Sequence, residues 1–229
     1  MLRKTKIAAV LSILAAGPCF SGFYIGAGLG PEGASFSQKS DVVRPLTFYV
    51  EDHNHFAGTG GFGTLFAGYS WTFNRFYIAA EGNANISSVK YKLTNEEFLN
   101  NNFSKTTFTI PHSEGISILP GFYLRPDTLF YGRIAYANGR IKIRESDPTI
   151  RSNSLNRDGL RYGLGLRQDI TDRWVFMMDY SQIHYNDIKS RVFEPMGNVT
   201  KSTRIIPNSA QVAFGVIYKF GVPIKAYIK

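Results

Sequence analysis

Apolar residues alternate with small or polar residues in eight separate stretches of this chain. The stretches cover residues 23–29, 62–73, 76–87, 116–124, 129–138, 159–170, 174–184 and 210–220. Alternation with a period of two is typical of a β-strand whose two faces meet different surroundings. At 229 residues the chain is long enough for one all-β domain with a sizeable core. The pattern therefore predicts an all-β fold of eight strands.

The connections between these stretches are alternately short and long. Asn74-Arg75, residues 125–128 and residues 171–173 are short turns, whereas long polar segments make the other connections. This arrangement places every long loop at one end of an up-and-down antiparallel sheet. It is the pattern of an eight-stranded transmembrane β-barrel with short periplasmic turns and long extracellular loops.

Two features favour a barrel in a membrane over a soluble barrel. The second face of the stretches is rich in glycine and alanine, as the crowded interior of an eight-stranded barrel requires. Large aromatic residues gather near the short turns, which predicts an aromatic girdle at the level of the lipid headgroups. The girdle comprises Tyr69, Trp71, Phe73, Phe76, Trp174, Tyr218 and Phe220.

The N-terminus has the pattern of an export signal. A basic start containing Arg3, Lys4 and Lys6 precedes an apolar run over residues 7–16, and small residues follow. We interpret residues 1–21 as a signal peptide cleaved before Gly22, residues 22–220 as the barrel and residues 221–229 as a short tail. Cleavage would remove the single cysteine and reduce the formal net charge from +9 to +6. For an exported basic chain, anionic lipid is a better expected partner than nucleic acid.

The chain resembles the small eight-stranded outer-membrane β-barrel proteins of Gram-negative bacteria, the OmpA transmembrane-domain and opacity-like porin family. The resemblance rests on "GFYIGAGLG", "GTLFAGYSWTFNRFYIAAEG", "FYGRIAYANG", "GLRYGLGLRQDITDRW" and the closing "QVAFGVIYKF". It implies a location in the bacterial outer membrane, contact with lipid and lipopolysaccharide, and a last strand read by the outer-membrane assembly machinery. The family usually ends at the aromatic residue that corresponds to Phe220, whereas nine residues follow it here.

Charged residues at strand positions are predicted to form a layer inside the barrel. Glu81, Arg133 and Asp179 each lie about five residues above the short-turn end, which is roughly 13 Å and near the middle of the apolar band. Arg167 and Arg161 share the inward face. Because unpaired buried charges cost several kcal/mol, Glu81 and Asp179 are expected to pair with these arginines. The layer is interpreted as a static plug, with a gate or narrow ion path as the alternative.

Catalytic and metal sites have weak support in the sequence. His112 and Ser113 are adjacent, but no third group at a suitable spacing would orient the histidine as a base. His53 and His55 lie in a polar loop beside Glu51 and Asp52, and are a weak metal-binding candidate. No cofactor and no enzymatic activity are expected.

Three functions remain as hypotheses. The first is an envelope-structural or surface-interaction role, in which the extracellular loops meet host or surface ligands. The second is a narrow porin-like channel, and the third is a lipid-modifying outer-membrane enzyme. Basic residues in the long loops are interpreted by default as solvated, and the alternative hypothesis is that those near the barrel rim contact lipopolysaccharide phosphates.

Overall fold

The computed structural model describes residues 19–45, 47–97, 102–145, 153–194 and 199–220, which form ten β-strands. The predicted signal sequence lies outside the described residues except for 19–21, and so does the tail 221–229. None of the described residues forms a helix long and apolar enough to cross a membrane. The strands are β1 (Cys19–Arg44), β2 (Phe48–Phe73), β3 (Phe76–Ser87), β4 (Lys90–Glu97), β5 (Asn102–Arg125), β6 (Thr128–Glu145), β7 (Asn153–Asp169), β8 (Trp174–Tyr185), β9 (Ile188–Glu194) and β10 (Val199–Lys219).

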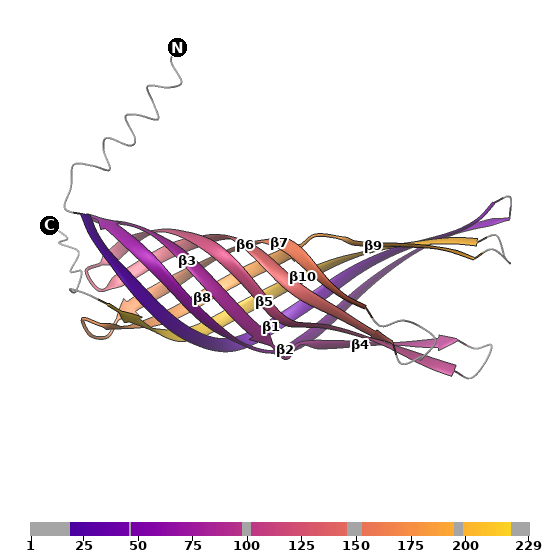
Figure 1. Cartoon of the computed structure of the whole chain (residues 1–229), viewed down its shortest axis with the longest axis horizontal. Coiled ribbons are helices and arrows are strands. Elements are labelled where there is room, and N and C mark those ends of the chain that lie inside the picture. The colour runs from indigo at the N-terminus through magenta and orange to yellow at the C-terminus, as the bar shows by residue number, and fades with distance from the viewer. Residues whose placement is uncertain (1–18, 46, 98–101, 146–152, 195–198, 221–229) are drawn as a thin grey trace, which may run out of the picture.

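Eight of these strands close into an antiparallel barrel (Figure 1). Their order is β1-β2-β3-β5-β6-β7-β8-β10, and β10 pairs with β1 to complete the ring. The prediction of an eight-stranded up-and-down barrel is therefore confirmed. β2 and β3 are joined by the predicted Asn74-Arg75 turn, where Asn74 has a left-handed φ of 55° that asparagine tolerates better than most residues.

Alternation along the strands divides an apolar outer surface from a packed interior. Leu29, Phe76 and Ile134 point outward and are 70%, 70% and 60% exposed. Tyrosine rings inside the barrel lie over glycines on neighbouring strands. Tyr24 is registered against Gly68, and a Cβ added to Gly68 would lie 2.6 Å from the Tyr24 ring. Glycine at this position makes room for a ring that fills the lumen.

Within the described residues, much of each long connection is paired β-strand, which the sequence pattern did not predict. β1 and β2 continue as a paired hairpin far beyond the barrel, from Gly30↔Phe62 up to Arg44↔Phe48. β4 and β9 are two further strands that the sequence pattern did not predict. A strand that rises into water lacks a lipid-facing side, so its polar residues occur on both faces and the apolar alternation disappears.

These extensions form two four-stranded sheets, which we call the first arm and the second arm. The first arm has the order β2-β1-β10-β9, and the second has the order β4-β5-β6-β7. Figure 1 shows the extensions leaving the barrel at the same end in two diverging groups. At their bases the arms meet through Phe36 and Phe108, whose ring centroids are 5.5 Å apart.

The interior is filled from end to end by two apolar clusters and a polar layer. A lower cluster at the short-turn end includes Tyr77, Leu119 and Val175, and an upper cluster at the bases of the arms includes Ile141 and Ile183. Charged side chains lie within and between these clusters. The barrel is therefore packed with side chains, as eight strands require.

Candidate functional site

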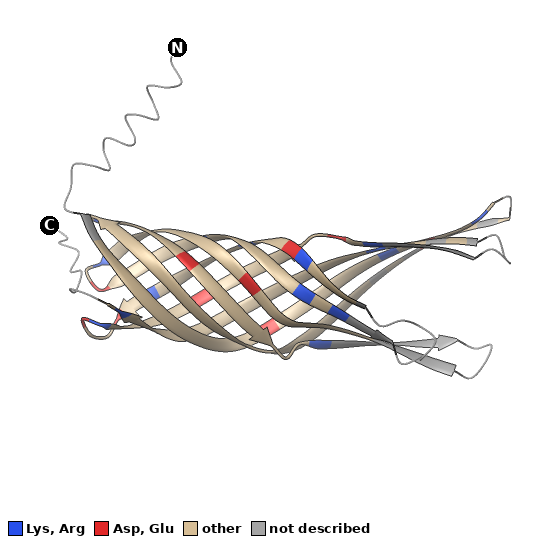
Figure 2. Ribbon diagram, in the orientation of Figure 1, with Lys and Arg blue, Asp and Glu red and all other residues tan. Residues whose placement is uncertain are grey.

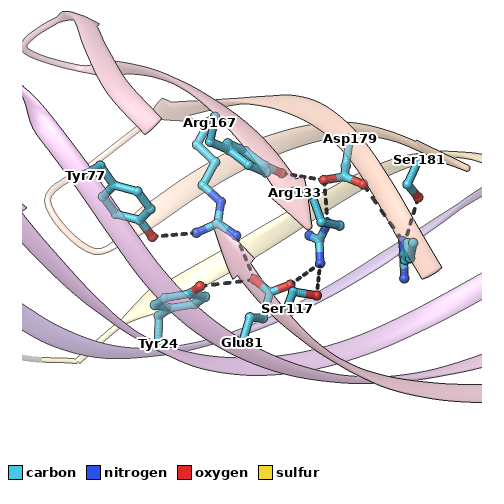
Figure 3. A network of polar contacts seen from close by, with 10 residues as sticks. Tyr24, Tyr77, Glu81, Ser117, Arg133, Arg167, Asp179 and Ser181 are labelled. Carbon is cyan, nitrogen blue, oxygen red and sulfur yellow. Dashed lines mark hydrogen bonds and ion pairs between the residues drawn. The ribbon is translucent and has the colours of Figure 1, made fainter. Parts of the chain in front are cut away.

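Arg133 on β6 lies at the centre of a buried charge network (Figure 3). Its Nη1 atom lies 2.7 Å from Glu81 Oε1 on β3, and its Nε atom lies 3.2 Å from Asp179 Oδ2 on β8. Nη1 also donates to the Ser117 hydroxyl at 3.0 Å. One guanidinium thus bridges the two carboxylates that the sequence placed at mid-height.

Arg167 on β7 reaches the same carboxylate from the short-turn side. Its Nη2 atom donates to Glu81 Oε2 at 2.8 Å, and its Nη1 atom donates to the Tyr77 hydroxyl at 2.9 Å. The guanidinium carbon lies 4.8 Å from the ring centroids of both Tyr24 and Tyr131. These two rings add cation-π attraction to the ion pair, and Tyr24 also donates to Glu81 at 3.1 Å.

Arg161 completes the network on the side of the arms. Its Nη2 atom is 3.9 Å from Asp179 Oδ1, and its Nε atom donates to the Ser181 hydroxyl at 3.0 Å. Asp179 also accepts from the Tyr131 hydroxyl at 2.8 Å. The structure therefore brings together all five residues predicted for the lumen layer, and none of them is more than 5% exposed.

This arrangement cross-links the wall of the barrel through its interior. The five charged side chains come from β3, β6, β7 and β8. Three of the four ion pairs join strands that are not neighbours, and the pair Arg161–Asp179 joins the neighbouring strands β7 and β8. Two carboxylates face three guanidiniums, and every carboxylate oxygen of the network has a hydrogen-bonding or charged partner. Compensation of this kind offsets the several kcal/mol that each buried ion loses on leaving water.

The network also closes the lumen. At the short-turn end a small pocket extends inward and is lined by Tyr24, Tyr77, Tyr123 and Arg167. Its lining stops at Arg167 and includes none of the carboxylates behind it. Beyond Arg167 the lumen holds the buried side chains of Glu81, Arg133, Asp179 and Arg161.

A second buried polar contact lies nearer the arms. Glu32 on β1 accepts from Ser209 at 2.5 Å and from Gln211 at 2.9 Å, both on β10, and is 4% exposed. The contact ties β1 to β10 on the inner face of the barrel. The interpretation from sequence did not include Glu32. Its even-numbered position continues the inward-facing alternation of Tyr24, Gly26 and Gly28, so counting along the strand could have placed it inside the barrel.

The residues predicted as an aromatic girdle lie at the short-turn end of the barrel. Tyr69, Phe76, Trp174 and Phe220 are between 41% and 70% exposed. Many of the rings pack edge to face: Tyr69 against Trp71 at 4.9 Å, Trp174 against Tyr218 at 5.1 Å, and Tyr218 against Phe220 at 4.9 Å. Phe73 is half-buried on the same face at the end of β2.

The weak metal candidate does not assemble into a site. His53 is exposed in the first arm and contacts Glu51, with 3.0 Å between Nε2 and Oε1. A hydrogen bond from Lys39 lowers the pKa of the Glu51 carboxyl below its usual value, so this carboxylate already has a cation. His55 is exposed as well, and no group of three or more potential ligands occurs among the described residues.

The adjacent His112 and Ser113 cannot act as a base and nucleophile pair. Neighbouring residues of a strand point to opposite faces, and here His112 is exposed whereas Ser113 is buried. Ser113 instead accepts a hydrogen bond from the Asn85 amide at 3.0 Å. The wall of the barrel separates the two side chains.

Polar contacts at the outer face near the arms were missed from sequence. The Tyr162 hydroxyl contacts Gln182 and His184 at 2.8 Å each, and the Tyr162 and His184 rings are stacked. Tyr136 contacts Asp158 on the same outer face. These residues mark a second boundary of the apolar band. Counting ten residues along β8 from Trp174 would have placed His184 about 25 Å higher, at the far side of such a band.

A closed barrel with an apolar outer band, an aromatic girdle and an ion-paired interior defines a small outer-membrane β-barrel protein. The chain belongs to the outer membrane protein beta-barrel domain family, whose model matches residues 7–220. The protein is accordingly located in the bacterial outer membrane. The short turns then face the periplasm and the two arms face the exterior.

Solved structures of other outer-membrane proteins resemble the chain in fold. Ail of Yersinia pestis, solved with the heparin analogue sucrose octasulfate, is 17% identical, with 83% of this chain and 99% of that chain covered and a TM-score of 0.36. Neisserial surface protein A is 16% identical, with coverage of 88% and 99% and a TM-score of 0.44. The Escherichia coli protease OmpT is 9% identical, with coverage of 87% and 97% and a TM-score of 0.43. A search among curated proteins gave no match. At these sequence identities and TM-scores, the resemblance to the solved structures says nothing about the function of this chain.

Proposed function

We propose that the protein is a non-enzymatic surface-interaction protein that acts through its extracellular arms. The observation that carries this proposal is the β2 edge of the first arm, which is one of two edges of this arm without a further described strand. Residues 48–59 of β2 pair with β1 on one side, and no described strand pairs with them on the other. A free edge presents backbone N–H and C=O groups to which an extended segment of another protein can add as a further strand.

The side chains along this edge suit a polar partner. Tyr49 and Val50 are 61% and 51% exposed, and Glu51, His53 and His55 are exposed beside them. An edge with both aromatic and charged groups offers side-chain contacts in addition to the backbone ladder. We therefore infer a host or surface protein as the partner class.

The channel hypothesis is weakened by the lumen. Its polar layer is fully buried and ion-paired, and the periplasmic pocket ends at Arg167. The enzyme hypothesis is weakened by the separation of His112 from Ser113 across the wall. Lipid A mass spectrometry on cells with and without the protein tests the enzyme hypothesis directly: a new lipid A species would contradict our proposal.

The experiment for the surface role compares shortened arms. Lys39 and His53 are registered partners, so residues 40–52 can be replaced by an Asn-Gly turn without changing the pairing below. In the control variant, residues 95–104 of the β4–β5 hairpin are replaced by Asn-Gly between Thr94 and Lys105. Both are produced in a non-adherent laboratory strain, and attachment to cultured epithelial cells is counted.

We expect the intact protein and the control to promote attachment, and the variant with the shortened first arm to lose it. Surface display is verified by heat-modifiable gel migration of outer-membrane fractions. Equal attachment by both shortened variants would show that the β2 edge is not the binding element.

We also infer that residues 1–21 are an export signal and that the strand ending at Phe220 is read by the assembly machinery. β1 begins at Cys19, three residues before the expected cleavage point. Intact-mass measurement of the protein from outer membranes tests the first inference: a mature chain that retains residue 1 would contradict it.

A further inference from the structure

The barrel wall splits between β7 and β8 at the extracellular end. The last registered pair of their ladder is Gly159↔Tyr185. Above it, β7 continues beside β6 in the second arm, whereas the chain after β8 enters β9 of the first arm. One backbone hydrogen bond, from Asn186 N to Asp158 O at 2.7 Å, lies at the point of separation.

A hollow that is open to solvent lies at this split. Its polar lining comes from Arg157, His184, Asn186, Asp187 and Lys189. The outward-facing Leu160, 56% exposed, lies at its apolar side. We call this hollow the rim cleft.

The rim cleft lies at the height of the outer headgroups. His184 follows the periplasmic girdle residue Trp174 by ten residues on β8. Ten residues of a strand tilted by about 40° climb roughly 25 Å, which is the height of the apolar band of such barrels. The hydrogen bonds of His184 with Tyr162 and with Asn208, at 2.8 and 2.7 Å, are polar contacts expected at a membrane boundary.

The charges of the rim cleft are unbalanced. The Asp187 carboxylate is engaged by Arg204 through two guanidinium nitrogens. In the part of the chain that the structure describes, neither Arg157 nor Lys189 forms an ion pair. The Nε atom of Arg157 is buried and has no hydrogen-bond acceptor. Two cations and an unused donor therefore face one hollow, and Figure 2 shows that Lys and Arg gather where the strands leave the barrel.

We propose that the rim cleft binds the phosphorylated headgroup of an outer-leaflet lipid. A phosphate provides several strong acceptors for Arg157 and Lys189, and charge-assisted hydrogen bonds of this kind are the strong ones. Leu160 lies where the first part of an acyl chain would pass. A lipid is favoured over a soluble phosphate because the cleft joins an apolar lip to a cationic interior at the membrane surface. This site is separate from the β2 edge of the first arm, so the two proposals stand or fall independently.

The test is a titration of the purified full-length barrel in detergent with bis-phosphorylated lipid A, followed by native mass spectrometry. The test variants are R157Q/K189Q and the single variant K189Q, whose side chain is exposed. The control R75Q/R125Q removes two exposed charges at the periplasmic turns. Heat-modifiable migration verifies that each variant is folded.

We expect R157Q/K189Q to bind lipid A roughly tenfold more weakly or worse, K189Q to be intermediate, and the control to match the unmodified protein. Lipid A without phosphates should bind the unmodified protein as weakly as the double variant. Unchanged binding by folded R157Q/K189Q, or an equal loss in the control, would overturn the proposal. Displacement of lipid A by excess inorganic phosphate alone would assign the cleft to a soluble ligand instead.

Discussion

Arg133 is the residue on which the interior depends most. It touches both buried carboxylates, whereas Arg167 and Arg161 each touch one. A buried ion pair stabilises little by itself when compared with apolar packing, but the loss of one member leaves a buried charge without compensation. The network therefore favours the one arrangement of the strands in which every buried charge has a partner of opposite charge.

The substitution Arg133→Met tests this dependence. It leaves Asp179 with Arg161 at 3.9 Å as its remaining cation and removes one of the two cations of Glu81. We expect the free energy of unfolding to fall by about 3–5 kcal/mol, the cost of breaking a buried pair. Urea unfolding in lipid vesicles, followed by tryptophan fluorescence, measures it. Arg125→Met in an exposed turn is the control, and a comparable small change in both variants would contradict the assigned role.

The glycines under the lumen tyrosines make a second prediction at this scale. In Gly68→Ala the new Cβ would lie 2.6 Å from the Tyr24 ring and 2.8 Å from the Ala80 carbonyl oxygen, so the ring and strand must shift. Overpacking of this kind is expected to cost about 1–3 kcal/mol. Gly82→Ala is the matched control, because its Cβ would point outward with nothing within 4 Å. The same unfolding measurement should show little change for Gly82→Ala, and equal effects of both substitutions would refute the packing argument.

At the scale of elements, the strands inside the membrane were predictable and the strands above it were not. Residues 76–87 alternate because lipid lies on one side and the lumen on the other, so β3 has the predicted bounds. Above Phe36, which still packs in the upper apolar cluster, polar residues of β1 such as Gln38 and Lys39 occur on both faces. The alternation of apolar residues therefore does not predict the strands of the arms, although the backbone pairing of these strands continues directly from the barrel.

The depth of outward residues can be tested by charge placement. Ile134 lies on the outer face of β6 six residues above Thr128, near the middle of the apolar band, whereas Phe76 lies at the girdle. Ile134→Arg is expected to reduce the free energy of unfolding in lipid vesicles by about 2–4 kcal/mol, and Phe76→Arg by about 0–1 kcal/mol. Similar costs at both positions, or the reverse order, would show that the girdle is not at the interface.

At the scale of the whole molecule, the pairing of lumen charges could be anticipated only in part. Strand parity and height placed Glu81, Arg133 and Asp179 in one layer. The aromatic and hydroxyl partners, Tyr24 and Ser117 among them, depend on how far each strand is staggered relative to the next. That stagger is set by the closure of the barrel and has no local signature in the sequence.

The barrel and the two arms of the molecule have different roles. The barrel holds the protein in the membrane with a filled lumen, and the arms and their rims supply exposed polar surface outside it. Because the charged layer of the lumen is buried and ion-paired, we propose that other molecules bind at the outer surfaces. The central claim is thus that the protein acts from its surface and conducts nothing through its centre.

Conductance of single molecules in planar lipid bilayers tests this claim most directly. The refolded full-length protein is added to the bilayer in concentrated potassium chloride, and insertion is verified by heat-modifiable migration of protein recovered from the same lipid. Because Arg133 and Arg167 tie both sides of the lumen to Glu81, we predict a baseline current without unitary steps. Stable unitary steps that scale with salt concentration would contradict the account and favour a narrow channel.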